Sequence, residues 1–301
     1  MDQRMLLVHA HPDDETIQQG ATMAKYAARG TQVTLVTCTL GEEGEVLVPE
    51  LEHLASHRED KLGQHRIGEL ANAMKLLGVS DHRFLGEAGK YRDSGMVWHE
   101  EGHAIAGEEV KEGTFWRADL LEAAADLVEV IREVRPQVLV TYDQFGGYGH
   151  PDHIQAHRVA MYGASLAAVR SFRPELGESW DVSKIYWGAM SENRMREGLR
   201  RLRAMGDTTT FEGMDPEGPM GPFVTPDHLI DAVVDGNEFV DAKMEAMKAH
   251  ATQITVDGPF FALSNNVGSE VWGTEYFRLA RGVRGPVNED GLETDLFAGL
   301  E

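Results

Sequence analysis

A short apolar run, a helical stretch and a second apolar run follow one another at the amino terminus, and this order restricts the possible fold more than any other feature. The first run, Met5 to Val8, precedes a helical stretch from about Thr16 to Ala28. Gly30 ends that stretch, and the β-rich run Gln32 to Thr39 follows. A strand, a crossover helix and a second strand form the unit from which parallel sheets are built. The amino terminus therefore predicts a parallel sheet covered by helices.

The alternation of helix and strand patterns continues beyond this unit. Further helices are expected at about 56–77, 115–134, 154–171, 192–205 and 237–250, and further strands at 82–85, 137–142 and 184–190. The segment 208–226, rich in Gly, Pro and Asp, predicts a surface excursion or lid. Together these patterns indicate an α/β fold: a Rossmann-like, mostly parallel sheet flanked by helices, with a smaller C-terminal α/β extension.

Composition and charge exclude several classes of protein. With 301 residues and 42% apolar side chains, the chain is large enough to bury a full hydrophobic core. The 50 acidic and 28 basic residues leave a formal net charge of −22, which repels nucleic-acid phosphates and anionic lipid headgroups. We therefore expect neither nucleic acid nor a membrane surface as a partner, and a neutral or cationic small molecule is the favoured ligand.

Cysteine usage and the lengths of the apolar segments indicate the compartment. Cys38 is the only cysteine, which excludes an intrachain disulfide, and its place in the second strand predicts a buried thiol. No apolar stretch has the length of a signal peptide or of a membrane span. These features predict a cytoplasmic protein and leave its oligomeric state open.

Two short motifs place histidines and aspartates directly after apolar strands. The first motif is His9-Ala10-His11-Pro12-Asp13-Asp14-Glu15, and the second is Tyr148-Gly149-His150-Pro151-Asp152-His153. Because parallel strands end at the same edge of a sheet, both motifs are expected to meet in one cleft at that edge. Mixed nitrogen and oxygen donors of this kind suit zinc or another first-row divalent ion. Metal-assisted hydrolysis is the reaction class that follows.

The adjacent carboxylates Asp13 and Asp14 can divide two tasks between them. One can bind the metal while the other accepts a proton from metal-bound water, whose pKa the metal lowers to about 7. The motif alone does not say which aspartate performs which task. A histidine outside the metal's ligand set, held by a carboxylate such as Asp152, can stabilise an oxyanion or protonate a leaving amine.

These motifs carry a resemblance to a known family. Ala10–Glu15 and Gly149–His153 resemble the LmbE-like (PIG-L) family of zinc-dependent N-acetylglucosaminyl deacetylases. Five further stretches resemble the mycothiol-pathway deacetylases within that family: Thr37–Val46, His65–Leu70, Arg92–Met96, Val140–Asp143 and Ala262–Asn266. The resemblance extends from the first strand to about residue 270 and so covers most of the chain.

The resemblance implies roles for particular residues. Three match the family's zinc ligands: His11, Asp14 and His153. Four match its catalytic residues: the general base Asp13, the acid or electrostatic stabiliser His150, the carboxylate Asp152 that orients it, and the mobile Tyr148 that helps to hold the oxyanion. Two match residues that grip sugar and inositol hydroxyls: Arg66 and Asp93. Without the resemblance, Arg66 would be expected on a solvated helix face and Asp93 as a turn cap.

The activity implied by the resemblance is zinc-dependent removal of acetate from N-acetylglucosaminyl-inositol in mycothiol biosynthesis. One zinc ion per chain is expected, and iron(II) is an alternative because it accepts the same donors. The resemblance also implies one deacetylase domain over 1–301, with a Rossmann-like core at 1–175 and a part at 176–301 that completes the substrate cleft. The segments 98–114 and 208–226 match no part of the family pattern.

Two other functions stay open at this point. Gln18 stands where the deacetylases carry a serine and the related mycothiol-conjugate amidases a lysine. The missing lysine argues against the first alternative, a mycothiol S-conjugate amidase. The second alternative is a metal-dependent glycoside-binding protein without catalysis, and the intact Asp13 argues against it because binding alone needs no general base.

Overall fold

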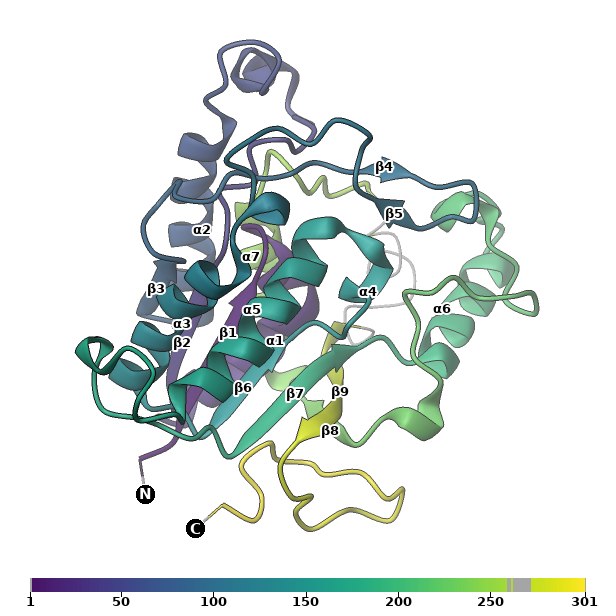
Figure 1. The fold of residues 1–301 in the computed structure, drawn as a ribbon. Helices are drawn as coiled ribbons and strands as arrows, with labels where there is room; N and C mark the ends of the chain where they lie inside the picture. The colour runs from purple at the N-terminus through teal and green to yellow at the C-terminus, as the bar shows by residue number, and fades with distance from the viewer. Residues whose placement is uncertain (1, 259–260, 262–271, 301) are drawn as a thin grey trace.

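The central feature of the fold is a seven-stranded sheet in the order β3-β2-β1-β6-β7-β9-β8 (Figure 1). The structure, a computed structural model, describes residues 2–258, 261 and 272–300. The strands are β1 (Arg4–His9), β2 (Gln32–Thr37), β3 (Asp81–Phe84), β6 (Val138–Thr141), β7 (Lys184–Ala189), β8 (Ala232–Asp235) and β9 (Thr274–Arg281). The strands from β3 to β7 in this order are parallel, whereas β9 runs antiparallel to both of its neighbours.

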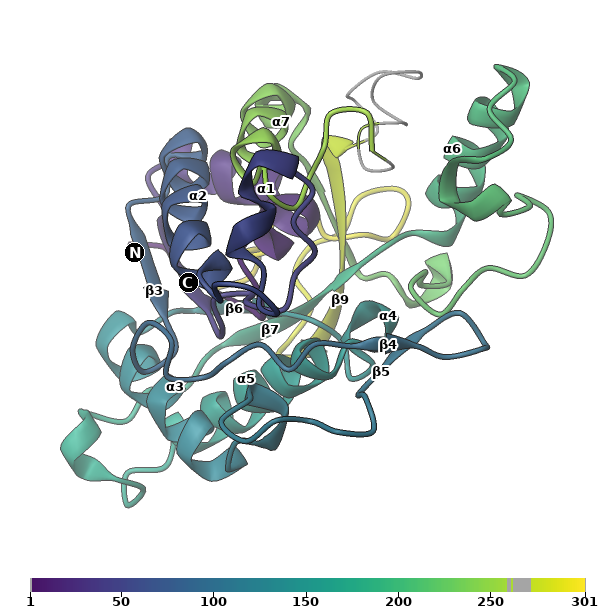
Figure 2. The ribbon, with the colours of Figure 1, turned by 90° about the horizontal axis from the view of Figure 1, so that it is seen from above.

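Helices cover both faces of this sheet. Figure 2 shows α1, α2 and α7 on one side and α3 and α5 on the other, with α6 apart from both layers. The α-helices are α1 (Asp14–Ala28), α2 (Leu62–Leu77), α3 (Leu120–Val134), α4 (Gly146–Gly149), α5 (Pro151–Ala167), α6 (Glu192–Ala204) and α7 (Val240–Ala249). Short 3-10 helices occupy Pro49–Leu54, Phe115–Arg117, Pro174–Leu176, Thr210–Gly213, Asp227–Leu229 and Asn237–Phe239. Within the described residues, no helix is both long and apolar enough to cross a membrane.

Alternation along β1 explains why both faces of the sheet are buried. Leu6 and Val8 pack into the apolar cluster formed with α3 and α5, whereas Met5 and Leu7 pack into the cluster formed with α1, α2 and α7. All four side chains are fully buried. A strand covered on both faces has a continuous apolar sequence, which is typical of parallel sheets between helix layers.

The predicted fold class is confirmed, and the differences lie at helix boundaries and in the C-terminal part. The helix expected at 115–134 begins at Leu120, because Asp119 accepts two backbone N–H groups of its first turn and so caps it. The helix expected at 56–77 begins at Leu62. The strand predictions missed β8 and β9, since both segments mix charged with apolar side chains.

A fully buried ion pair ties the C-terminal segment to the sheet. Lys184, the first residue of β7, places Nζ 2.6 Å from Oε1 of Glu293, and neither side chain is exposed. The Tyr186 hydroxyl donates to Oε2 of Glu293 at 2.6 Å, and Lys184 Nζ also donates to the Ala298 carbonyl at 2.7 Å. Each buried charge is therefore compensated by hydrogen bonds as well as by the opposite charge, as a buried pair requires.

Glu293→Ala is expected to destabilise the protein by about 3–5 kcal/mol, because it leaves the Lys184 ammonium buried without its counter-charge. Urea unfolding followed by circular dichroism measures this loss. Glu217→Ala is the matched control, since it removes the partner of Arg200 in an exposed ion pair and should leave the unfolding midpoint unchanged. Equal midpoints for Glu293→Ala and the wild type would contradict this view of the buried pair.

Candidate active site

A cavity of about 1120 Å³ lies where β1, β6 and β7 end. Most of the residues to which the family resemblance gives a role line this cavity: His11, Asp13, Asp14, Arg66, Asp93, Tyr148 and His150. The other two, Asp152 and His153, are buried next to it. Part of the remaining lining comes from α6 and from the segment 208–226. The structure thus brings every predicted site residue to one edge of the sheet.

The first turn connects β1 to α1 and is strained at Asp13. This residue has a φ of +114°, a backbone conformation that side chains other than glycine rarely adopt. Two carboxylates hold the turn: Glu15 accepts the Asp13 N–H at 2.9 Å, and Asp14 accepts the His11 N–H at 2.9 Å. Such strain persists only where surrounding contacts impose it, and it is concentrated at functional sites.

The second turn connects β6 to α5 through the glycine-rich turn α4. Gly149 has a φ of +97°, and a Cβ atom there would lie 2.3 Å from the Ala104 carbonyl oxygen, so only glycine fits. His150 is the N-cap of α5, and its Nδ1 accepts the Asp152 backbone N–H at 3.1 Å. Burial lowers the pKa of His150 well below its usual value, so the ring is neutral and carries its proton on Nε2.

His11, Asp14 and His153 lie next to one another at the cavity. Nδ1 of His11 lies 3.3 Å from Oδ2 of Asp14, and Nε2 of His153 lies 3.3 Å from Oδ1. Donors bound tetrahedrally to zinc at about 2.0–2.1 Å are about 3.3–3.4 Å apart. Nδ1 of His153 donates to the Gly146 carbonyl at 3.1 Å, so Nε2 is the ring atom that faces Asp14. In the described part of the chain this buried Nε2 has no hydrogen-bond partner, as fits a metal ligand.

Two other groups of donors occupy the same place, and both include His11. His11 forms one group with His150 and His153, and another with Asp93 and Asp152, each with ligand atoms within 4.8 Å of one another. Nδ1 of His150 already accepts a backbone N–H. Both carboxylates of the second group also accept backbone N–H groups from the loop that follows residue 92. The family resemblance, rather than the hydrogen bonding, singles out His11, Asp14 and His153 among these donors.

Asp13 and Asp14 are neighbours in the chain but have opposite electrostatic surroundings. Burial raises the pKa of Asp13 to about 6, and the guanidinium of Arg66, 3.2 Å from its Oδ2, acts against this shift. Burial also disfavours ionised Asp14, yet His153 and His11 outweigh it and lower the pKa of Asp14 well below its usual value. Asp14 is thus a permanent carboxylate, whereas Asp13 is suited to gain and lose a proton near neutral pH.

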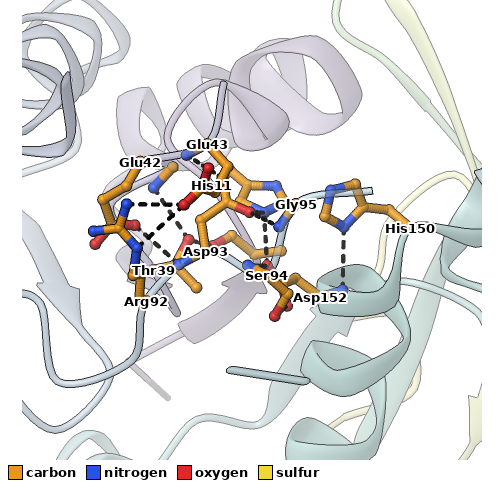
Figure 3. A network of polar contacts seen from close by, with 12 residues as sticks. His11, Thr39, Glu42, Glu43, Arg92, Asp93, Ser94, Gly95, His150 and Asp152 are labelled. Atoms are coloured by element: carbon orange, nitrogen blue, oxygen red, sulfur yellow. Dashed lines mark hydrogen bonds and ion pairs between the residues drawn. The ribbon is translucent and has the colours of Figure 1, made fainter. Parts of the chain in front are cut away.

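Asp152 contacts different groups from those expected (Figure 3). Its carboxylate lies 3.3 Å from Nε2 of His11 and accepts the Ser94 backbone N–H at 2.8 Å. Asp152 contacts the His150 ring through its backbone N–H and not, within the described residues, through its carboxylate. The reason is helix geometry. Because His150 is the N-cap of α5, its ring accepts a backbone N–H of the first helical turn, and the Asp152 side chain points towards His11 instead. A carboxylate behind a metal-binding histidine fixes the orientation of its ring.

Arg66 and Asp93 are buried in the cavity wall. The Arg66 side chain donates to the carbonyls of Pro12 and, at 2.8 Å, Gly41, so it holds the first turn against the loop after β2. With 2% of its surface exposed, Arg66 does not lie on a solvated helix face. Asp93 accepts the Gly95 N–H at 2.8 Å, so it caps a turn as well as lining the cavity.

Tyr148 lies between the histidines and the mouth of the cavity. Its ring centroid is 5.0 Å from that of His153 and 6.0 Å from that of Trp98, whose side chain is 63% exposed. Burial raises the pKa of Tyr148, so its hydroxyl keeps a proton to donate. Trp98 belongs to a hairpin of β4 (Val97–Trp98) and β5 (Ala104–Ile105), a segment to which sequence reasoning gave no role.

Comparison with known families agrees with this geometry. Residues 6–163, just over half of the chain, match the family model described as PIG-L: GlcNAc-PI de-N-acetylase. The chain belongs to the PIG-L family. It is therefore a hydrolytic N-deacetylase, and the family predicted from the two turns is confirmed.

Two curated relatives match this PIG-L deacetylase over almost its whole length. One, from Nocardioides sp. strain JS614, is 71% identical over 99% of both chains. The other, from Kribbella flavida, is 67% identical over 99% of this chain and 98% of its own. Each is named 1D-myo-inositol 2-acetamido-2-deoxy-alpha-D-glucopyranoside deacetylase. The structure of N,N'-diacetylchitobiose deacetylase from Pyrococcus horikoshii has a similar fold, with a TM-score of 0.59 and 20% identity over 92% of this chain and 83% of that one.

Tyr142 is the main residue of the deacetylase site that sequence reasoning missed. Its hydroxyl donates to Oδ2 of Asp14 at 2.7 Å and accepts the Ala10 N–H at 2.9 Å. Its ring stacks on that of His153, with centroids 4.3 Å apart and an interplanar angle of 22°. One hydroxyl thus links the two turns. A tyrosine directly after a buried strand was the available signal, because the first turn also follows its strand directly.

Two further supporting residues lie in stretches that carried the resemblance, but sequence reasoning gave them no role (Figure 3). The Ser94 hydroxyl donates to Asp152, and Glu42 accepts the Asp93 backbone N–H at 3.0 Å. Both contacts join segments that are far apart in the sequence. The stretch Ala262–Asn266, which contributed to the resemblance, lies outside the described residues.

Tyr142→Phe is expected to weaken metal binding about 10- to 100-fold, because Asp14 loses the hydroxyl that orients it. Competition with a chromogenic chelator measures the affinity. Tyr162→Phe, a change to an exposed tyrosine on α5, is the matched control and should bind metal as the wild type does. If Tyr142→Phe also keeps the wild-type affinity, Asp14 is held in place without this hydrogen bond.

Proposed function

We propose that this deacetylase hydrolyses the acetamide of N-acetylglucosaminyl-inositol to glucosaminyl-inositol and acetate, and that the free amine then serves mycothiol biosynthesis. The proposed substrate is supported by sequence identities of 71% and 67%, over nearly the full length, to two relatives named for this deacetylation. The chemistry is supported by the placement of Asp13, His11 and Asp14 in one cavity, with His153 buried next to it.

The metal in this proposal is zinc, one ion per chain, held by His11, Asp14 and His153. Iron(II) is the alternative, because it accepts the same nitrogen and oxygen donors. A divalent ion bound there supplies a water of lowered pKa and polarises the carbonyl of the substrate amide. Asp152 supports this set through His11, and Tyr142 supports it through Asp14.

The side chains around this set carry the proton transfers. Asp13 accepts a proton from the attacking water as its oxygen adds to the acetamide carbon. The Tyr148 hydroxyl and the Nε2–H of His150 donate to the oxyanion that forms on the former carbonyl oxygen. When the C–N bond breaks, the proton that Asp13 took from the water passes to the amine nitrogen, His150 keeps its role as a hydrogen-bond donor, and acetate is released.

Substrate binding in this proposal uses both parts of the chain. Arg66 and Asp93 grip the sugar and inositol hydroxyls on the side of the cavity formed by residues 1–175. Side chains of the part at 176–301, among them Met190 and Phe223, also line the cavity and complete the cleft for a small neutral glucosaminide. This division supports a single catalytic domain with its substrate cleft between the two parts.

Acetate release from N-acetylglucosaminyl-inositol by the purified, zinc-loaded protein tests the proposed function. We expect rapid release that a chelator abolishes, with little release from free N-acetylglucosamine. A mycothiol S-conjugate is assayed in parallel, since Gln18 lines the cavity where the amidases carry a lysine. Cleavage of the conjugate without acetate release from the inosityl substrate would replace the proposal by the amidase. Saturable sugar binding without any cleavage would replace it by a binding protein.

Asp13→Ala is expected to lower kcat by about 10²- to 10⁴-fold while the protein keeps its metal, because only the proton acceptor is lost. Asp14→Ala should instead lose both metal and activity. Acetate release together with metal analysis separates the two results. Asp290→Ala, which removes an exposed carboxylate, is the control and should match the wild type in both measurements. An active Asp13→Ala variant would refute the assigned role.

A further inference from the structure

The β4–β5 hairpin at the mouth of the cavity carries a second cluster of metal-binding side chains. His99 and His103 face each other directly beyond the two strands: the His99 N–H donates to the His103 carbonyl at 2.8 Å. Gly102, with a φ of +76°, closes the turn by donating its N–H to the His99 carbonyl at 2.9 Å. Opposed residues at such a position hold their Cβ atoms about 5 Å apart. The turn therefore presents two imidazoles side by side.

Three donors gather on this turn. Ligand atoms of His99, Glu101 and His103 all lie within 4.8 Å of one another. The two imidazole rings are stacked, with centroids 4.7 Å apart and an interplanar angle of 30°. Nδ1 of His99 accepts the Glu101 backbone N–H at 3.2 Å and lies 3.9 Å from Oε2 of Glu101, so Nε2 is the ring atom left to bind an ion. The side chains of His99 and Glu101 are 42% and 78% exposed. Exposed side chains can rotate by the small amount that shortens these spacings to the roughly 3.3 Å of zinc ligands.

We propose that His99, Glu101 and His103 form a second, exchangeable site for a first-row divalent ion, with zinc as the ion to test. Two imidazole nitrogens and one carboxylate oxygen are a donor set that zinc accepts, and solvent exposure leaves a fourth position for water. This site shares no residue with the set formed by His11, Asp14 and His153. It is weaker than that set, because two of its donors are exposed and the third, His103, is only half-buried, so they are less rigidly held.

The position of this second site couples it to the cavity. His99, together with its neighbours Trp98 and Glu100, lines the mouth of the cavity. On the other strand, the carbonyl of Ala104 packs against Gly149, the residue before His150. An ion on the turn therefore lies at the substrate entrance and narrows it. Excess zinc is then an inhibitor that acts at the hairpin while the catalytic set stays occupied.

Zinc stoichiometry tests the site independently of catalysis. In equilibrium dialysis with zinc, the wild type is expected to bind two ions per chain, one of which a mild chelator removes. The double variant His99→Ala/His103→Ala should bind one ion, which resists the mild chelator. His57→Ala, which removes an exposed histidine away from the hairpin, is the control and should bind two. Equal stoichiometry in the double variant and the wild type would overturn the proposal.

The double variant could lose the second ion because its hairpin is disturbed. Glu101→Gln tests this alternative, because it changes one exposed side chain without loss of volume. It should keep the tightly bound ion and weaken the chelator-sensitive one about tenfold or more. The proposed site would also be overturned if Glu101→Gln bound both ions with wild-type affinity and the single variant His103→Gln still bound two zinc ions per chain.

The inhibitory effect rests on the proposed deacetylase activity, whereas the stoichiometry does not, so failures of the two proposals are distinguishable. Acetate release is measured while zinc is raised above one equivalent per chain. We expect the wild type to be inhibited and the double variant His99→Ala/His103→Ala to stay active over the same range. Equal inhibition of both proteins would show that excess zinc acts elsewhere and would overturn the inhibitory role.

Discussion

The carboxylate of Asp14 is the group on which the two halves of the site depend. It accepts the N–H of His11 within its own turn, receives the hydroxyl of Tyr142 from beyond β6, and faces Nε2 of His153 on α5. This meeting is possible because β1 and β6 are hydrogen-bonded parallel neighbours, so their following turns leave the sheet side by side. Close packing against both faces of these strands keeps that alignment rigid.

Neighbouring groups acquire different chemistry in this site because their partners differ. Asp14 is surrounded by histidines and stays ionised, whereas Asp13, one residue earlier, is buried beside a single guanidinium and has a raised pKa. The positive φ of Asp13 turns the two carboxylates into these separate environments. Arg66 holds the same turn from outside by binding the Pro12 carbonyl. Backbone strain, burial and one buried cation thus give two adjacent, identical side chains different protonation behaviour.

The parts of the protein that could be predicted are those encoded by local pattern. The apolar runs at β1 and β6 are continuous because both faces are buried, so their positions and the parallel sheet follow from the sequence. Strands β8 and β9 could not be recognised, since β9 carries charged residues, among them Glu275, which is buried and paired with Lys243. The helix at 115–134 was overextended because its true start depends on the Asp119 cap.

The chemistry of the site is encoded locally: two turns after buried strands, each with its own histidines and aspartates, lie at positions that a parallel sheet must bring together. Which groups these side chains contact is set by the packing of distant segments. Asp152 turns to His11, Tyr142 binds Asp14, and the hairpin with His99 reaches the cavity mouth. The difference lies in the sequence separation of the interacting residues. Strand and turn formation depend on residues a few positions apart, whereas these contacts join segments separated by up to 141 residues.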